Sequence, residues 1–287
     1  MRATLKILSA GVGLSIQDAG RLGWRRFGVP VGGAMDRHAC AAANRLLGNG
    51  EDAPALEMML MGARLQVLRD TWIALAGADL GGPVEPWTAQ RVTAGTILSF
   101  PRNRSGLFAY LALPGGIVAP QWFGSASADA RIGVGEKLKV GDELLPARAM
   151  PVVSTERVAR RVLPLDARRS YEARQTFELL PGPQFDQFTE AAQKQLVGSE
   201  WKISARSDRT GFRLEGPALD VPASIRSEPV LPGSFQIPGS GQPIVTMVDG
   251  PTVGGYAKIA ILRQADRDRL AQCAPGTQIH FEWADSL

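Results

Sequence analysis

Glycine and proline most constrain what this chain can fold into. There are 32 Gly and 20 Pro among the 287 residues, about 18% of the chain against a usual share of about 12%. Both residues interrupt helices, because Gly loses the most backbone freedom on folding and Pro lacks the N–H that a helix interior uses. The apolar runs left between them are short, as strands are. The sequence therefore predicts a mostly β fold with many turns and a few short helices.

The expected strands are bounded by Gly, Pro and Asp. One helix is indicated in the first half, because Asp36 is a good N-cap, apolar residues follow at helical spacing and Gly48 stands at the end. Two further short helices are expected over 185–195 and 266–272. We expect strands over 55–61, 65–68, 72–76, 96–100, 106–113, 176–180 and 277–283.

The length predicts two domains, at roughly 150 residues each. A faint internal repeat supports this prediction, since Arg21–Arg25 is echoed by Arg209–Arg213. We expect a first domain over 1–150 with a helical insertion at about 34–50, a linker or crossover over 151–175, and a second domain over 176–287. The N-terminal segment is expected to exchange between the domains.

Charge and composition exclude several classes of protein. The 32 basic and 28 acidic residues are interspersed and give a net charge of +4, without the clustered footprint of a nucleic-acid binder. Two Cys and two His exclude a disulfide scaffold and argue against a metal centre. No apolar stretch approaches the roughly 18 residues that span a bilayer. The first 15 residues are interpreted as a strand and not as a signal peptide, so we expect a cytoplasmic protein.

Common cofactor motifs are missing from the sequence. There is no GxxxxGK[ST] loop, no GxGxxG after a strand, no GxSxG elbow and no Met-Lys-Met biotinylation tripeptide. If ATP or biotin takes part in the function, we expect it on other chains or bound without a recognisable motif.

Two glycine-rich segments carry the candidate site residues. The segment 17–36 contains Arg21 and Asp36 among five glycines, and arginine suits the capture of carboxylates or phosphates. Its structural alternative is a long hairpin whose arginines pair with local acids. The choice between these two interpretations is open from composition alone.

The second segment, 249–258, places an acid, a phenol and an amine close together. Asp249 ends a strand, Gly254-Gly255 is expected to form a turn with free N–H groups, and Tyr256 and Lys258 are expected to share one face of the next strand. Such groups suit proton transfer on a small polar substrate. The structural alternative is a tight hairpin with a surface lysine.

A series of motifs resembles a known family. In order, these are IQDAGRLGWRRFGVPVGGAMD at 16–36, ANRLLGN at 43–49, ALEMMLMG at 55–62, LPGGI at 113–117, GPQFDQF at 182–188, SDRTGFRLEGPAL at 207–219 and SEPVLPGSFQIPGSGQPIVTMVDGPTVGGYAKIA at 227–260. Together they make the chain similar to the family of 5-oxoprolinase C subunits, also described as biotin-dependent carboxyltransferase-like or allophanate hydrolase subunit 2 proteins. The Kip inhibitor-antagonist belongs to this family.

The resemblance implies a fold and a function. The implied fold is two cyclophilin-like β-barrel domains, and the implied assembly contains a B-type subunit and often a large A-type subunit. The implied reaction is the ATP-dependent opening of 5-oxoproline, or a related small lactam, to an amino acid. One alternative is a carboxyltransferase component that acts on a urea-like amide with biotin on another chain. Another is a non-catalytic regulatory partner of a B-type or Kip inhibitor-like protein.

The same resemblance gives the hypotheses for the site. Pro251 and Val253 replace a polar amide and a hydroxyl residue of the family pattern, and such losses change specificity. No metal ligands are expected. The expected catalytic residues are Gln236, Asp249, Tyr256 and Lys258, and the expected substrate-binding residues are Arg21, Asp36, Arg209, Gly254 and Gly255.

Overall fold

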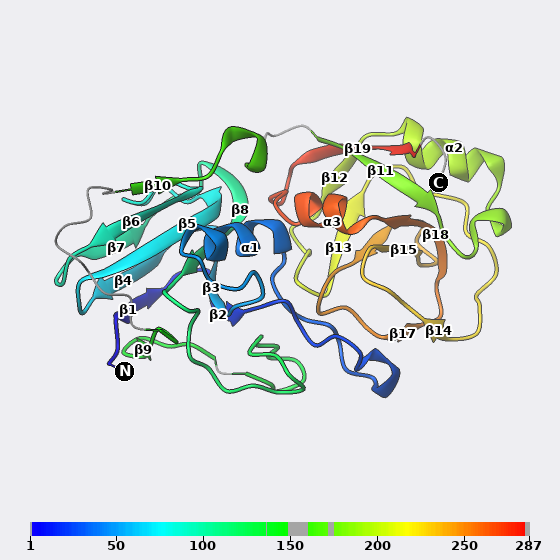
Figure 1. Ribbon diagram of the computed structural model, residues 1–287. Helices are drawn as coiled ribbons and strands as arrows, with labels where there is room; N and C mark the ends of the chain where they lie inside the picture. Colours follow the sequence, from blue (N-terminus) through cyan, green and yellow to red (C-terminus); the bar gives the residue numbers. More distant parts are fainter. Residues whose placement is uncertain (1, 136, 149–159, 172–174, 285–287) are drawn as a thin grey trace. The chain divides into compact units, whose positions relative to one another are not determined.

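The computed structural model describes residues 2–135, 137–148, 160–171 and 175–284. The chain forms two compact units. The first consists of Met1–Arg21 and Gly32–Tyr171, and the second of Leu22–Val31 and Glu172–Leu287 (Figure 1).

The first unit contains two antiparallel sheets. The four-stranded sheet has the order β7-β4-β1-β9 and the six-stranded sheet the order β10-β6-β5-β8-β3-β2. The strands of the first sheet are β1 Leu5–Ala10, β4 Ala63–Val67, β7 Ile97–Phe100 and β9 Glu143–Leu144. Those of the second are β2 Gly13–Gln17, β3 Ala55–Met59, β5 Thr71–Asp79, β6 Thr88–Val92, β8 Ser105–Ala112 and β10 Arg160–Val162.

One apolar core joins these two sheets. Ile7 of β1 and Leu65 of β4 belong to the same buried cluster as Ile73 of β5 and Leu111 of β8. The helix α1, Arg37–Leu46, packs against β5 and β8 (Figure 1). Its N-cap is Asp36, whose Oδ1 accepts a hydrogen bond from the Ala39 N–H at 3.0 Å. The predicted helix and its cap are therefore confirmed.

The second unit is built on a closed barrel of seven strands, in the order β11-β18-β15-β16-β13-β12-β19. Its interior holds Phe281 between two other aromatic rings. The centroid of the Phe281 ring lies 6.1 Å from that of Phe177 and 5.0 Å from that of Phe235. The strands are β11 Gln175–Pro181, β12 Trp201–Ile203, β13 Gly211–Glu215, β15 Ser234–Ile237, β16 Ile244–Thr246, β18 Ala257–Leu262 and β19 Gln278–Trp283.

Short elements surround this barrel. They are the 3₁₀ turn η3 Phe185–Gln187, the helices α2 Glu190–Gly198 and α3 Gln264–Leu270, and a separate two-stranded ladder of β14 Glu228–Pro229 with β17 Val253–Gly254. Figure 1 shows β14 and β17 together beside the barrel. The mostly β class with few short helices is confirmed, and the closed barrel is found in the second unit.

A segment from the N-terminal part of the chain completes the second unit. Residues 22–31 contain the 3₁₀ turn η1, Arg25–Phe27. Arg25 Nη2 donates to the carbonyl oxygen of Val230 and lies 3.4 Å from that of Pro251. Burial lowers the pKa of this guanidinium. Arg25 therefore ties the segment to residues that flank β14 and β17.

The local predictions differ from the structure at identifiable places. The expected helix over 185–195 is divided, because Thr189 caps a new helix by accepting from the Ala192 N–H at 3.1 Å. The strand β6 lies in the stretch 55–100 that is expected to be β-structure, but outside the runs singled out there. Within the expected linker 151–175, residues 160–162 form β10, which pairs with β6. Residues 149–159 and 172–174 lie outside the described residues.

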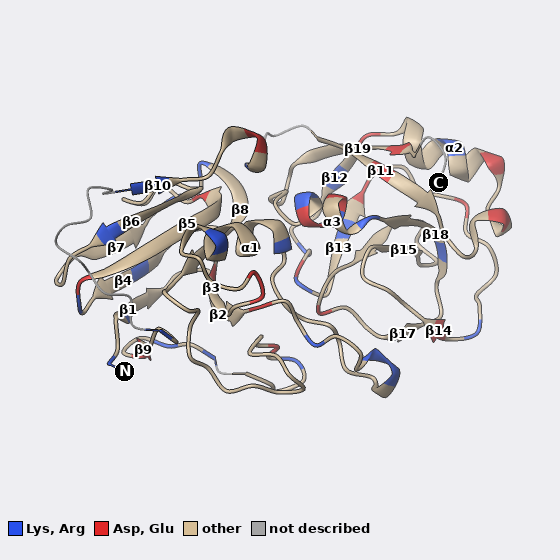
Figure 2. Cartoon of the chain, viewed as in Figure 1, with Lys and Arg blue, Asp and Glu red and all other residues tan. Residues whose placement is uncertain are grey.

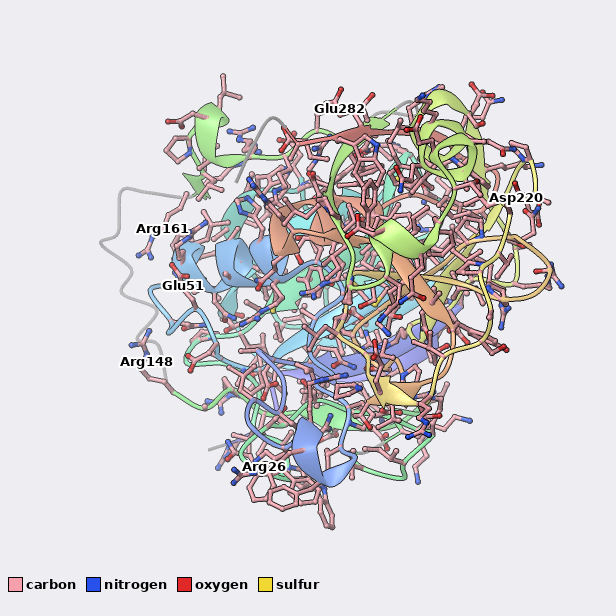
Figure 3. The ribbon with its side chains drawn as sticks, turned by 90° about the vertical axis from the view of Figure 1, so that its right-hand side faces the viewer. Arg26, Glu51, Arg148, Arg161, Asp220 and Glu282 are labelled. Carbon is pink, nitrogen blue, oxygen red and sulfur yellow. The ribbon has the colours of Figure 1, made fainter. Side chains whose placement is uncertain are left out.

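Charges are distributed over both units. Figure 2 shows Lys and Arg, and Asp and Glu, scattered over the ribbon of each. Arg26 points outward from η1 (Figure 3), and its guanidinium lies 4.8 Å from the centroid of the Phe27 ring. Among the described residues, no helix has the length and hydropathy needed to cross a membrane.

Candidate functional site

Two of the expected catalytic residues face each other on neighbouring strands of the barrel. Gln236 of β15 pairs directly with Lys258 of β18, and directly opposed residues point to the same face of a sheet. Gln236 is 6% exposed and Lys258 is 2% exposed. The alternative of a surface lysine is therefore wrong. The strands hold an amide and an amine side by side in a buried position.

A carboxylate meets the amine of Lys258. Glu228 Oε1 lies 2.5 Å from Lys258 Nζ, and Gln184 Nε2 donates to the same oxygen at 2.8 Å. The hydrogen bond from Lys258 is the main cause that lowers the pKa of the Glu228 carboxyl group, and the hydrogen bond from Gln184 lowers this pKa further. Apart from Glu228, no described residue accepts a hydrogen bond from Lys258 Nζ. Since an ammonium has three N–H donors, this buried group has unused capacity.

The side-chain amide of Gln236 is positioned by a hydrogen bond to Thr246 and by the space that Gly254 leaves beside it. Its Nε2 donates to Thr246 Oγ1 at 2.9 Å. A Cβ atom added to Gly254 would lie 2.8 Å from Gln236 Oε1, so only glycine lets the amide take this position. Gly254 lies in β17, opposite Glu228. The turn that we expected at this glycine is therefore a strand. Gly255 follows it, with Ile225 O 3.4 Å from the position of an added Cβ.

Asp249 and Arg209 form a bidentate pair. Arg209 Nε and Nη2 donate to the two carboxylate oxygens at 2.7 and 3.1 Å, and the Asp249 N–H donates to the Arg209 carbonyl at 3.0 Å. Asp249 is 4% exposed. Both carboxylate oxygens face the guanidinium, so the pair fixes the loop after β16 against the loop before β13.

Tyr256 differs from the other expected catalytic residues. It precedes β18 and is 48% exposed, whereas Lys258 is buried. The expectation that both side chains share one strand face is therefore wrong, because the strand begins only at Ala257.

Arg21 is part of the fold of the first unit. The residue is fully buried, and its Nη2 donates to the Ser127 carbonyl oxygen. The side chain thus holds the loop that contains Ser127 against the end of β2.

Asp36 is also enclosed in the first unit. Besides capping α1, it accepts a hydrogen bond from Tyr171 Oη at 2.7 Å. Its N–H donates to Tyr110 Oη, which donates to Glu57 Oε2, both at 2.8 Å. Burial raises the pKa of Tyr110. These contacts anchor Asp36 in the first unit, and the substrate-binding role expected of it stays a prediction.

Another buried carboxylate of this unit, Asp18, lies in the same segment 17–36 but was not among the expected site residues. Asp18 accepts hydrogen bonds of 2.6 Å from the hydroxyl groups of Ser125 and Ser127 and from the Ala126 N–H. It also accepts from the Gly20 N–H at 2.8 Å. The available signal was the Ser-x-Ser spacing at 125–127, but these serines lie more than 100 residues from Asp18.

The two cysteines are buried, and His38 is partly buried. Burial raises the pKa of both thiols, to about 12 for Cys273. His38 Nε2 lies 3.0 Å from the Ala167 carbonyl oxygen, and burial lowers its pKa. Among the described residues, no group of three or more His, Cys, Asp or Glu side chains is arranged to hold a metal ion.

Comparisons of the sequence identify relatives of the whole chain. Residues 27–283 match the family model described as carboxyltransferase domain, subdomain A and B. The 5-oxoprolinase C subunit of Escherichia coli (strain K12) is 37% identical over 96% of this chain and 90% of its own length. That of Haemophilus influenzae is also 37% identical, over 97% and 90%. The urea amidolyase of Saccharomyces cerevisiae is 29% identical over 96% of this chain but 16% of its own length.

Solved structures agree with these matches. The crystal structure of TTHA0988 superimposes with a TM-score of 0.87 at 33% identity and covers 98% of this chain. This chain spans about half of that protein, 55%. The Kluyveromyces lactis urea amidolyase superimposes with a TM-score of 0.87 at 28% identity, over 97% of this chain and 18% of its own. The chain thus belongs to the carboxyltransferase domain family, subdomains A and B, together with the 5-oxoprolinase C subunits.

Proposed function

We propose that this chain is the C subunit of an ATP-dependent 5-oxoprolinase, which opens 5-oxoproline or a related small lactam to an amino acid. The proposal includes a B-type partner and a large A-type partner, without which the chain is inactive, and a cytoplasmic location. Its support from the comparisons is the 37% identity to a 5-oxoprolinase C subunit over nearly the whole chain.

The structural observation that carries the proposal is the buried Lys258 ammonium beside Gln236. Opening a lactam places negative charge on the carbonyl oxygen, and a fixed positive charge in a water-poor site stabilises it. Lys258 has donors available for such an oxygen. Gln236, fixed by Thr246, can orient the planar amide group through its own amide.

The remaining expected residues take supporting roles in this proposal. The Arg209–Asp249 pair shapes the loops beside β16. Tyr256, half exposed, is available to a substrate or to a partner chain. Gly254 makes room for Gln236.

ATP does not fit the residues around Lys258. A nucleoside triphosphate carries several negative charges, whereas Lys258 is one cation already paired with Glu228. The sequence has no phosphate-binding loop either. We therefore assign ATP to the assembled complex and not to this chain alone. This chain has no Met-Lys-Met tripeptide for the attachment of biotin.

Two other functions remain as alternatives. The urea amidolyase and putative urea carboxylase relatives, 29–30% identical, favour a carboxyltransferase component that acts on a urea-like amide with biotin on another chain. Pro251 and Val253, which replace polar residues of the family pattern, favour a changed substrate or a regulatory partner of a B-type or Kip inhibitor-like protein. Val253 is 54% exposed and Pro251 binds Arg25 through its carbonyl oxygen.

The test is reconstitution. The chain is co-expressed with its B-type and A-type partners, and ADP and glutamate are measured with and without 5-oxoproline. Stimulated ADP formation with release of glutamate is expected. A stable complex that responds to urea and biotin instead would favour the carboxyltransferase, and a complex with no response to either would favour the regulatory partner.

A further inference from the structure

Lys258 is the only buried lysine of this chain, and all six lysines are among the described residues. Burial of an amine disfavours its charged form, and a nearby carboxylate restores it. The group that supplies the carboxylate is Glu228, from the β14–β17 ladder, which is separate from the barrel sheet of Lys258. The counter-ion of this amine is thus a residue that sequence analysis did not select.

Gln184 links this carboxylate to the backbone of Lys258. Its side-chain oxygen accepts from the Lys258 N–H at 3.1 Å, and its backbone N–H donates to the Lys258 carbonyl at 3.2 Å. Its Nε2 then donates to Glu228 Oε1 at 2.8 Å. Gln184 is 7% exposed. One buried amide therefore fixes Glu228 and Lys258 relative to each other.

The contact geometry leaves part of the ammonium unused. Glu228 Oε1 is the one described acceptor near Nζ, and it can occupy one of the three N–H bonds. A buried donor without an acceptor is costly to the fold. The remaining N–H bonds can therefore donate to an oxygen of a bound ligand.

We infer that Glu228 and Gln184 are positioning residues, which hold the Lys258 ammonium in place and leave its remaining N–H bonds for an oxygen of a small lactam or carboxylic acid. This inference rests on the proposed function for the identity of the ligand. Lys258 acts as a fixed cation and not as a neutral amine that takes up a proton or attacks a carbonyl. The oxygen is the substrate carboxylate or the lactam carbonyl oxygen, and two probes distinguish them.

The first test measures the amine without any enzyme activity. The full chain is labelled with ¹⁵N in lysine, and the Nζ signal of Lys258 is assigned by its loss in K258M. The wild type should show an exchange-protected ammonium signal, and E228Q should lose it or shift it towards a neutral amine. E190Q is the matched control, because Glu190 pairs with the exposed Lys194 at 2.9 Å. An unchanged Lys258 signal in E228Q would overturn the inference, whatever the substrate.

The second test measures recognition in the reconstituted complex. E228Q should lower kcat/KM for 5-oxoproline by about 10-fold or more, the worth of a hydrogen bond to a charged group, and Q184A should lower it in the same direction. E228D, which keeps the charge, should recover part of the loss if E228Q folds poorly. Binding of 5-oxoproline is compared with binding of 2-pyrrolidinone, which lacks the carboxylate. If E228Q loses both ligands, Lys258 contacts the lactam carbonyl oxygen; if it loses 5-oxoproline alone, Lys258 contacts the carboxylate.

The two tests separate the inference from the proposed function. If no lactam is turned over by the wild-type complex, the proposed function fails, while the lysine signal still decides the role of Glu228. A fall in melting temperature in E228Q with unchanged kcat/KM and an unchanged lysine signal would show a structural role only and would contradict the inference.

Discussion

Asp18 in the first unit and Lys258 in the second are both buried charged side chains, but their surroundings differ. Asp18 accepts four hydrogen bonds, from two hydroxyl groups and two backbone N–H groups. Lys258 contacts one carboxylate, and no other described residue accepts from its Nζ. Burial is therefore accompanied by a full set of hydrogen-bond partners for Asp18 and by an incomplete set for Lys258.

The difference separates structural from functional polar groups. A buried charge with a full set of hydrogen bonds stabilises the loops that supply them. A buried charge with spare donors weakens the fold, and such groups concentrate at binding and catalytic sites. Composition alone gives no such distinction, because both residues lie in segments rich in glycine and polar residues.

The largest effect is expected for D18A, which should break the saturated cluster. The substitution leaves the Ser125 and Ser127 hydroxyl groups and the Ala126 N–H without their acceptor. We expect a loss of about 3–5 kcal/mol in the free energy of unfolding, measured by denaturant titration. E51Q is the control, since Glu51 is exposed and its pair with Arg45 lies on the surface. A change below about 1 kcal/mol in D18A would remove the distinction between the two residues.

In contrast to D18A, K258M should lower the activity of the complex and leave the stability of the fold nearly unchanged. Loss of the ammonium should lower kcat/KM for 5-oxoproline in the complex by about 100-fold or more. The free energy of unfolding should stay within about 1 kcal/mol, because methionine fills a similar volume without the cost of a buried charge. K194M, at an exposed lysine of α2, should change neither quantity. Strong destabilisation by K258M with retained turnover would make Lys258 a structural residue like Asp18.

G254A tests whether the position of Gln236 matters. The new methyl group would lie 2.8 Å from Gln236 Oε1 and should displace the amide. We expect kcat/KM to fall by about 10-fold, because small misplacements at a site slow the reaction steeply. G239A is the matched control, because a Cβ there meets nothing within 4 Å. Equal activity of the two variants would exclude Gln236 from the reaction.

The smallest expected effect is a pH dependence of stability. The pKa of Glu228 is lowered in the folded protein by Lys258 and Gln184. Its contribution is therefore present above the ordinary pKa of a glutamate and is lost as the pH falls through the lowered value. Because Glu228 is 37% exposed, we expect less than about 1 kcal/mol. Denaturant titrations of wild type and K258M between neutral and acid pH should show a smaller loss in K258M.

Local signals in the sequence predicted much of the fold. Asp36 and Gly48 mark the two ends of α1, and the short apolar runs bounded by Gly and Pro correspond to β3, β5, β7 and β8. The strand β6, Thr88–Val92, lies in the stretch expected to be β-structure but has no apolar run of its own, since buried Thr88 and Ala89 precede Gln90 and Arg91. Its assignment depends on β5 and β10 alongside it.

The candidate site was only partly predictable. Gln236 and Lys258 were selected from motifs, and the strand register brings them together. Glu228 and Gln184 were not selected, because they lie 30 and 74 residues before Lys258 and only the closed barrel and the β14–β17 ladder join them. Gly254 was selected for a turn, but its lack of a side chain serves the close approach of Gln236. Spacing in a sequence does not show such contacts.

The path of residues 22–31 limits how the gene for this protein can be divided. The chain enters the second unit at Leu22, returns to the first at Gly32 and leaves again after Tyr171. A single breakpoint anywhere along the coding sequence therefore fails to give two self-sufficient halves. A fragment that starts at Glu172 lacks the Arg25 guanidinium that binds Val230 and Pro251. Fission of the gene or exchange of one half by recombination would separate interdependent pieces, so we expect the two units to be inherited as one.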